Sequence, residues 1–295
     1  MTELAEKYGT PSFIYSKDRI VENFLGIERA FSSIPTDICF AVKANSNIGI
    51  LQILAQMGAG FDIVSGGELA RVLKAGGDPK KVVFSGVGKQ EWEILAGIHN
   101  KIRCFNVESS AELKQISEIA KSENYIAPIS LRVNPNIDPK THPYISTGLA
   151  ESKFGINIDV SEDLFQRAHE DPFLKLVGVD CHIGSQITEI EPFRAALSIL
   201  VKLVKGLSAK GINLSHIDIG GGIGIQYKDE EIIRWDKFAN EIIAEMGDLP
   251  HRLVLEPGRS IVGNAGVLLS RVVLLKKNGK RNFAVIDAGM NDLLR

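Results

Sequence analysis

The sequence predicts an α/β protein whose eight parallel strands and intervening helices close into a (β/α)8 barrel of the TIM type. Short apolar runs rich in β-branched residues alternate with amphipathic segments along the chain. Eight such units occupy roughly 240 residues, which matches the size of a closed barrel. The runs are nearly continuous in apolar residues, which indicates strands buried on both faces. An open, doubly wound sheet is the alternative that this pattern leaves.

Each expected strand is a short apolar run that ends at a polar or glycine-containing turn. The first crossovers are short and regular, whereas the later ones are longer and leave room for loops that build a site. In chain order, the strands are expected at residues 38–42, 60–64, 82–87, 103–107, 129–133, 177–183, 217–219 and 253–255.

The segments between most of these strands have the period of an amphipathic helix. Apolar residues recur there at steps of three and four. Capping boxes, Ser65 with Glu68 and Ser109 with Glu112, stand directly after strands and predict helix starts. Glycines are placed as helix stops at Gly58, Gly76 and Gly211.

The two chain ends predict a second, incomplete all-β domain beside the barrel. We expect the barrel to comprise residues 25–265 and the partial β domain to comprise residues 1–24 and 266–295. A few strands cannot bury a core of their own. The sequence is therefore expected to stop before the end of that domain.

Three strands are expected at these ends. Residues 10–16 read as a lone strand, followed by a helix over 19–31. Residues 266–275 and 283–286 read as two strands joined by a turn at 277–280, where Asn278 and Gly279 form a hairpin signal.

The composition excludes several classes of protein. A content of 44% hydrophobic and 24% charged residues is ordinary for a globular chain. The net charge is −2 and no basic run exceeds Lys276–Lys277, which argues against nucleic acid as a partner. No apolar run approaches the ~20 residues that span a bilayer. The first residues lack the apolar stretch of a signal peptide, so we expect a cytoplasmic protein without membrane partners.

The cysteines and histidines predict neither a disulfide framework nor a metal site. Cys39, Cys104 and Cys181 are odd in number and form no CxxC pair, so we expect small buried hydrophobic residues. The six histidines show no paired ligand spacing, so no metal is predicted.

Chemically active residues follow four of the expected strands. In a parallel barrel, the carboxyl ends of all strands meet at one rim, where catalysis takes place. Lys43 ends the first strand and His182 lies at the end of the sixth. A glycine-rich loop follows the seventh, and Glu256 and Arg259 follow the eighth. We expect these groups to converge.

Lys43 has two interpretations. It follows four small or apolar residues, and a lysine is rarely buried unless its charge is paired or removed. It is either the point where a strand reaches water or a desolvated amine that loses its proton easily and forms a Schiff base with an aldehyde.

The glycine-rich loop is not a nucleotide-binding fingerprint. The third glycine of GxGxxG is absent after Gly220 and Gly222, and no Gly-Lys-Ser/Thr follows. Consecutive glycines still expose backbone N–H groups, and barrels often hold phosphate beside strands seven and eight. A tight turn that needs positive φ is the alternative.

The remaining rim residues also have structural alternatives. Glu256 could pair with Arg259, or it could keep a heterocyclic nitrogen protonated so that the ring becomes an electron sink. His182 could be a core histidine or a neutral imidazole that lies on a ring face. A lysine, a phosphate cradle, a carboxylate and an imidazole at one rim together indicate pyridoxal 5′-phosphate.

Longer motifs resemble the alanine-racemase-fold decarboxylases that depend on pyridoxal 5′-phosphate. They are AVKAN at 41–45, HIGSQ at 182–186, DIGGGIG at 218–224 and EPGR at 256–259. Within that fold, the segments HPYISTG at 142–148, SKFGI at 152–156 and MNDLLR at 290–295 are similar to the diaminopimelate decarboxylase family.

The resemblance implies a role for each matching residue at the cofactor. Lys43 would hold the cofactor as a Schiff base, His182 would stack on its ring and Glu256 would hold the pyridine nitrogen, so these three are expected to be catalytic. The other residues expected to bind the cofactor, mainly around its phosphate, are Ser185, Gly220, Gly221, Gly222, Gly224, Pro257, Gly258 and Arg259.

The resemblance also implies a reaction, a substrate site and a partner. It implies decarboxylation of meso-2,6-diaminopimelate to L-lysine and CO₂, with Arg259 and Arg295 at substrate carboxylates. Family members continue into a β domain with a Cys-Glu-Ser-Gly-Asp motif and a late tyrosine that complete the site across a homodimer interface. None of these is present in this sequence.

Three other functions remain open at this stage. The first is a related decarboxylase that acts on ornithine, arginine or carboxynorspermidine. The second is a catalytically incomplete fragment or homologue that acts only by binding. The third is a phosphate-binding barrel enzyme in which Lys43 forms a Schiff base with a sugar.

Overall fold

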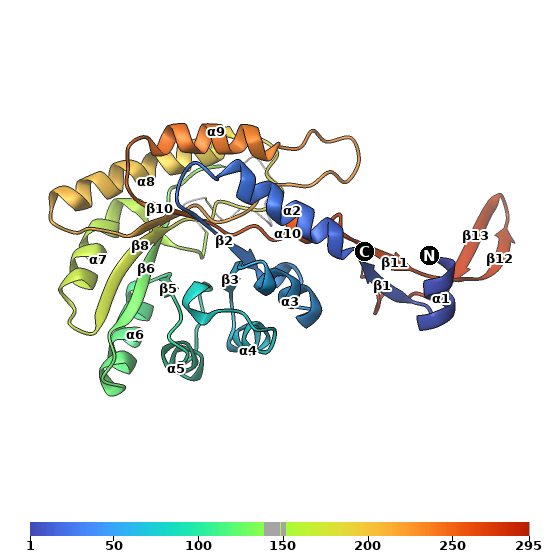
Figure 1. The fold of residues 1–295 in the computed structure, drawn as a ribbon, viewed down its shortest axis with the longest axis horizontal. Coiled ribbons are helices and arrows are strands. Elements are labelled where there is room, and N and C mark those ends of the chain that lie inside the picture. Colours follow the sequence, from blue (N-terminus) through green and yellow to red (C-terminus); the bar gives the residue numbers. More distant parts are fainter. Residues whose placement is uncertain (139–147, 149–151, 295) are drawn as a thin grey trace.

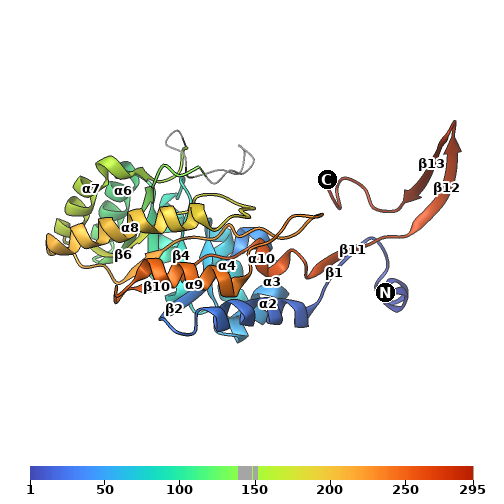
Figure 2. The ribbon, with the colours of Figure 1, turned by 90° about the horizontal axis from the view of Figure 1, so that it is seen from above.

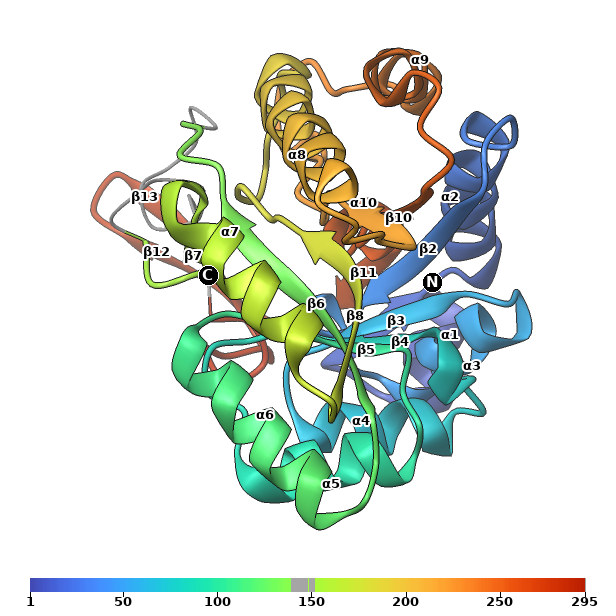
Figure 3. The same cartoon turned by 90° about the vertical axis from the view of Figure 1, so that its left-hand side faces the viewer.

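The computed structural model describes residues 1–138, 148 and 152–294. Its main feature is a closed barrel of eight parallel strands, which confirms the predicted fold class (Figure 3). Strand β5 pairs with both β4 and β6 and so closes the ring. A short additional strand, β7 (Ile156–Asn157), pairs with β6 outside the ring. The barrel strands are β2 (Thr36–Ala41), β3 (Gly60–Ile63), β4 (Val82–Phe84), β5 (Cys104–Val107), β6 (Ala127–Asn134), β8 (Leu174–Asp180), β9 (His216–Asp218) and β10 (Arg252–Leu255).

Helices surround the barrel on its outside (Figures 1 and 3). Their apolar faces pack on the outward side chains of the strands, including the fully buried rings of Phe40, Phe61, Phe84 and Phe105. The helices are α2 (Lys17–Ala30), α3 (Ile48–Gln56), α4 (Gly66–Lys74), α5 (Glu91–His99), α6 (Ser110–Ser122), α7 (Ile158–Glu170), α8 (Glu191–Ala209), α9 (Trp235–Met246) and α10 (Arg259–Val262).

The predicted N-caps Ser65 and Ser109 are present where strands turn into helices, but the glutamate of each expected capping box bonds the residue before the cap and not the cap itself. Ser65 Oγ accepts a hydrogen bond from Glu68 N–H, and a carboxylate oxygen of Glu68 accepts one from Val64 N–H. Ser109 Oγ likewise accepts from Glu112 N–H. These bonds satisfy backbone donors that the first turn of a helix leaves unpaired. Each strand therefore leads into its helix through a short, defined turn.

The two ends of the chain meet beside the barrel (Figure 2). Strand β1 (Ser12–Tyr15) pairs antiparallel with β11 (Gly266–Leu269), although the two are far apart in sequence. An N-terminal helix, α1 (Thr2–Tyr8), was not expected from the sequence. A hairpin of β12 (Val272–Asn278) and β13 (Arg281–Ile286) extends away from the barrel. All residues of both strands are exposed.

Some predicted boundaries are wrong. The strand expected over 266–275 is two strands, because Ser270 and Arg271 leave the strand conformation to bond Asp287. Lys43 does not end a strand: β2 stops at Ala41, and a turn of 3-10 helix, Val42–Ala44, carries the lysine. The sixth barrel strand stops at Asp180, before His182.

The interior of the barrel differs from the apolar layer outside it. Cys39, Val83, Cys104 and Val254 form a small apolar cluster in the lower part, with both thiols free and buried. The side chains that share that inward face nearer the rim are polar and buried. They are Asp62, Ser85, Asn106, Ser130, Arg132, Asp180, Asp218 and Glu256.

No helix in the described part of the chain is long and apolar enough to cross a membrane. The division at residues 25 and 265 stays a prediction.

Candidate active site

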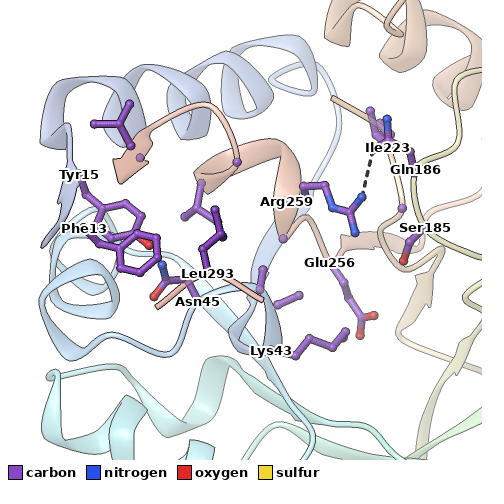
Figure 4. A pocket seen from close by; sticks show the side chains of 18 of the residues that line it. Phe13, Tyr15, Lys43, Asn45, Ser185, Gln186, Ile223, Glu256, Arg259 and Leu293 are labelled. Carbon is purple, nitrogen blue, oxygen red and sulfur yellow. Dashed lines mark hydrogen bonds between the residues drawn. The ribbon is translucent and has the colours of Figure 1, made fainter. Parts of the chain in front are cut away.

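A cavity of about 600 Å³ opens at the carboxyl ends of the barrel strands, beside β1 and β11. It brings together residues that lie far apart in the sequence. Side chains of Lys43 and Glu256 lie next to each other at its base, with Ser185 across from them (Figure 4). The predicted site residues that line it are Lys43, His182, Ser185, Gly222, Glu256, Gly258 and Arg259.

Lys43 forms an ion pair with Asp62 of β3 at the base of the cavity. The side chain of Asp62 is fully buried, whereas that of Lys43 is 44% exposed. Burial acts to lower the pKa of the Lys43 amine, but the carboxylates of Asp62 and Glu256 outweigh it and raise that pKa. The expected easy loss of the proton is therefore wrong for this state, because the sequence did not show that Asp62 would face the amine.

His182 lies in the cavity as a neutral imidazole. Its Nδ1 accepts a hydrogen bond of 3.2 Å from the N–H of Gly221, so the ring carries its proton on the other nitrogen. Burial, followed by the charges of Arg132 and Lys43, holds the pKa of His182 well below its usual range. The ring is thereby fixed in orientation and uncharged at neutral pH.

Glu256 directs its carboxyl group into the barrel interior. The residue is 4% exposed, and its Oε1 lies 3.5 Å from Asn106 Nδ2. Burial raises the pKa of Glu256 well above its usual range, and the carboxylates of Asp218, Asp62 and Asp180 raise it further. The carboxyl group of Glu256 therefore retains its proton to a higher pH than an exposed glutamate does.

Asp180 and Asp218 lie directly beneath Glu256. One carboxylate oxygen of each of the three residues lies within 4.8 Å of the others. The neighbouring cation is Arg132, whose Nε lies 3.8 Å from Asp180 and whose Nη1 lies 2.8 Å from Glu108. Like charges this close cannot all ionise in a buried site, so the cluster retains protons.

Stability of the cofactor-free protein should fall as this cluster loses protons. Burial raises the pKa of Asp218 to about 7, from an unfolded value of about 3.9. Between those values the folded state binds more protons, so the free energy of unfolding decreases as pH rises, by up to roughly 1.4 kcal/mol per pH unit. Asp218→Asn should remove part of that slope, measured by urea unfolding at pH 4.5, 6 and 8.

The comparison that decides this prediction is the difference between variant and parent at each pH. Asp218→Asn should gain stability relative to the parent from pH 4.5 to pH 8. A difference that stays constant across that range would contradict the prediction. Asp229→Asn, in an exposed loop, is the matched control for the loss of one carboxylate.

The glycine-rich loop after β9 is packed so closely that side chains do not fit. A Cβ on Gly221 would lie 2.0 Å from the backbone oxygen of Glu256, and one on Gly222 would lie 2.1 Å from that of Gly184. Gly220 and Gly222 also have positive φ, of 66° and 110°. The loop is therefore a tight turn. It also packs closely against the segment of Gly184 and the segment of Glu256 at the rim.

Arg259 and Glu256 do not pair with one another in the described part of the chain, so the predicted structural alternative of an ion pair is wrong. Arg259 Nη1 donates instead to Gln186 Oε1 at 3.2 Å, and its guanidinium lies 5.8 Å from the ring centre of Tyr227. Gly258 lies where a Cβ would come within 3.0 Å of Ala44. Gly258 and Arg259 stand at the start of α10, and both line the cavity.

Four predicted site residues lie beside the cavity without lining it: Gly220, Gly221, Gly224 and Pro257. One of them joins two rim segments: Pro257 O accepts a hydrogen bond of 3.0 Å from Ala41 N–H at the end of β2. Arg295 and most of the segment 142–148 lie outside the described residues.

Sequence reasoning missed the buried partners Asp62, Arg132, Asp180 and Asp218, and it missed the side chain of Gln186. A signal was available for the first four. Each is a charged residue inside an otherwise apolar parallel strand, where the cost of burial requires a compensating partner.

The chain is similar to known proteins over its full length. The family described as "Pyridoxal-dependent decarboxylase, pyridoxal binding domain" matches residues 17–263. Diaminopimelate decarboxylase of Pseudomonas aeruginosa is 51% identical over 295 residues, which are 100% of this chain and 71% of that protein. The enzyme of that name from Haemophilus influenzae is 50% identical over 294 residues, 99% of this chain and 71% of its own length.

A solved structure shows the same fold. The crystal structure of diaminopimelate decarboxylase from Helicobacter pylori complexed with L-lysine has a TM-score of 0.97 to this chain at 46% identity. The match covers 100% of this chain and 74% of the Helicobacter chain.

Proposed function

Since the chain belongs to the diaminopimelate decarboxylase family of pyridoxal-dependent decarboxylases, we propose that its cavity carries out the decarboxylation of meso-2,6-diaminopimelate to L-lysine and CO₂. The observation that supports this most is the meeting of Lys43, His182 and Glu256 at one cavity, on a chain about half identical to enzymes of that name. The convergence gives an amine, a neutral ring and a buried acid of raised pKa within one site.

The residues of the cavity fit pyridoxal 5′-phosphate. Lys43 supplies the only kind of side-chain group, a primary amine, that condenses with its aldehyde. Glu256 is a buried acid of raised pKa, and it would hold the pyridine nitrogen and share a proton with it. Gly222 and Gly258 line the cavity without side chains, so a phosphate could approach the backbone at these two positions. Arg259 adds a positive charge on the same wall.

The cofactor, when bound, supplies an electron sink for the pair released when the bond between the α-carbon and the carboxylate breaks. The residues of this chain do the remaining work. Glu256 keeps a proton available for the ring nitrogen, which strengthens the sink. His182 presents an uncharged ring that is held by Gly221, and it adds no competing positive charge. Asp62 holds Lys43 at the base of the cavity until the amine is needed.

Assays of the full chain with added cofactor test the proposal. We expect release of CO₂ and formation of lysine from meso-diaminopimelate, with a higher kcat/KM than for ornithine, arginine or carboxynorspermidine. A higher kcat/KM for one of those three would move the protein to a related decarboxylase. Cofactor binding without turnover of any of the four would indicate a relative that acts only by binding.

We also propose the finer features that the family resemblance implies. The protein would act as a homodimer in the cytoplasm, Arg259 and Arg295 would contact substrate carboxylates, and the barrel domain would comprise residues 25–265. The matched range 17–263 supports that division. The mass of the assembly, measured by light scattering, tests the homodimer.

A further inference from the structure

The loop after β8 and the glycine-rich loop after β9 are joined side by side at the rim. Ile187 N–H donates to Gly222 O at 2.9 Å, and Gly224 N–H donates to Ile187 O at 2.9 Å. These bonds form a short parallel bridge. The two loops therefore form one surface of the cavity, although 35 residues of sequence lie between the bridged residues Ile187 and Ile223.

Gln186 connects that surface to a third segment. Its Nε2 donates to Ile225 O at 2.6 Å, and its Oε1 accepts from Ile225 N–H at 3.2 Å. The same Oε1 accepts a hydrogen bond of 3.2 Å from Arg259 Nη1, at the start of α10 (Figure 4). The side chain of Gln186, which belongs to the segment after β8, thus contacts both the segment after β9 and the segment after β10.

Gln186 adopts an unfavourable backbone conformation, and the contacts of its side chain account for the use of glutamine at this position. Its φ is +59°, a left-handed conformation that is uncommon for residues other than glycine. Glycine or asparagine would adopt this φ more easily, but neither has a side chain long enough to reach both Ile225 and Arg259. The position therefore uses a less favourable backbone conformation together with a side chain of this length.

The chemistry of the contact leaves the charge of Arg259 available. Among the described residues, no carboxylate forms an ion pair with Arg259, and its polar partner is the neutral amide of Gln186. Tyr227 covers another side of the guanidinium, with 5.8 Å between the two centres. An arginine that is oriented by a neutral group keeps its full charge for an anion in the cavity.

We propose that Gln186 is a positioning residue that holds Arg259 against the glycine-rich loop, so that the guanidinium can bind an anionic oxygen group in the cavity. The proposal rests on the cofactor and substrate proposed above. Two groups share the required chemistry: the phosphate of the cofactor and a carboxylate of the substrate. Gln186 itself does not contact the reacting atoms.

Three substitutions separate orientation, charge and backbone effects. Gln186→Met keeps the length but loses all three hydrogen bonds. Gln186→Glu keeps the acceptors for Arg259 and Ile225, but its negative charge neutralises Arg259 and it cannot donate to Ile225 O. Gln186→Gly relaxes the backbone and removes the side chain. Gln52→Met and Gln52→Glu, on the exposed face of α3, are the matched controls.

The first measurement is binding of pyridoxal 5′-phosphate, and of pyridoxal without phosphate, to the cofactor-free full chain. If Arg259 binds the phosphate, all three Gln186 variants should weaken pyridoxal 5′-phosphate about tenfold and leave pyridoxal unchanged. If Arg259 binds the substrate, both dissociation constants should stay unchanged and KM for diaminopimelate should rise about tenfold with a smaller change in kcat. Both results support the positioning role and identify the anion.

The decisive comparison repeats Gln186→Met in an Arg259→Met background. A residue that acts through Arg259 should have almost no further effect there. An equal effect in both backgrounds, or unchanged cofactor affinity and KM in all three variants, would overturn the proposal. So would weakening that is the same for pyridoxal as for its phosphate, or that follows only the loss of melting temperature. The cofactor-binding measurements need no turnover, so they test the phosphate arm of this proposal even if the proposed reaction fails, whereas the KM arm depends on that reaction.

Discussion

A Lys43→Ala variant is expected to lose essentially all decarboxylase activity, because it removes the amine that would condense with the cofactor aldehyde. It should also carry no cofactor at position 43. Borohydride reduction followed by peptide mass mapping should locate the cofactor on Lys43 in the parent protein and nowhere in the variant. Cofactor fixed to another lysine of the parent would contradict the assignment.

Loss of the amine also has a structural effect that must be separated from the chemical one. Asp62 is fully buried, and Lys43 is its ion-pair partner. Breaking a buried pair costs about 3–5 kcal/mol, and the partial exposure of Lys43 reduces this to roughly 1–3 kcal/mol. A double variant, Lys43→Met with Asp62→Asn, removes both charges and should recover most of that stability without recovering activity.

The control for these variants is Lys74→Ala. Lys74 lies at the exposed end of α4, outside the cavity. It should change neither activity nor the site of reduction. If the double variant regained stability and also regained activity, then Lys43 would have a structural role and the reaction would proceed without its amine.

The convergence of Lys43, His182 and Glu256 could be predicted because barrel topology places the carboxyl ends of parallel strands at one rim. The sequence needed only to show that each residue follows an apolar strand. Strand ends were less accurate. The turn that carries Lys43 and the break after β11 depend on bonds to distant backbone and side chains, such as those of Asp287.

The charged layer inside the barrel could not be placed from the sequence. Asp62, Asp180 and Asp218 each interrupt an apolar run, and nothing local shows which of them face one another. Strand register decides this, since Asp180 is paired with Asp218 across β8 and β9. These partners contribute to the upward shifts in the pKa of Lys43 and of Glu256. That is why the predicted residues were found at the site but the protonation state of the lysine was wrong.

The contact of Gln186 with Arg259 depends on still less local information. It requires the left-handed backbone at Gln186 together with the bridge between two loops. The family resemblance implied a role for Ser185 in the same motif instead. The structure places Ser185 at the cavity wall and gives the contacts between segments to its neighbour.

A Glu256→Gln variant is expected to lose activity by about 10²- to 10³-fold while its stability stays unchanged or rises. Burial, together with the carboxylates of Asp218, Asp62 and Asp180, raises the pKa of Glu256, so an uncharged amide of equal size suits this site at least as well as the acid. Glutamine can still donate a hydrogen bond to a ring nitrogen, but it cannot transfer a proton to it. The loss should therefore appear in kcat, because the electron sink acts in the transition state.

Three measurements on Glu256→Gln decide between this role and a structural one. The melting temperature should not fall, the dissociation constant for pyridoxal 5′-phosphate should change less than kcat, and the absorption spectrum of the bound cofactor should differ from that of the parent. Glu231→Gln, in an exposed loop, is the control. If Glu256→Gln lost stability and cofactor affinity in proportion to activity, the carboxyl would serve packing alone. If kcat were unchanged, proton donation by residue 256 would have no part in the reaction. Glu256 would then act only as one member of the buried group of acids that it forms with Asp180 and Asp218.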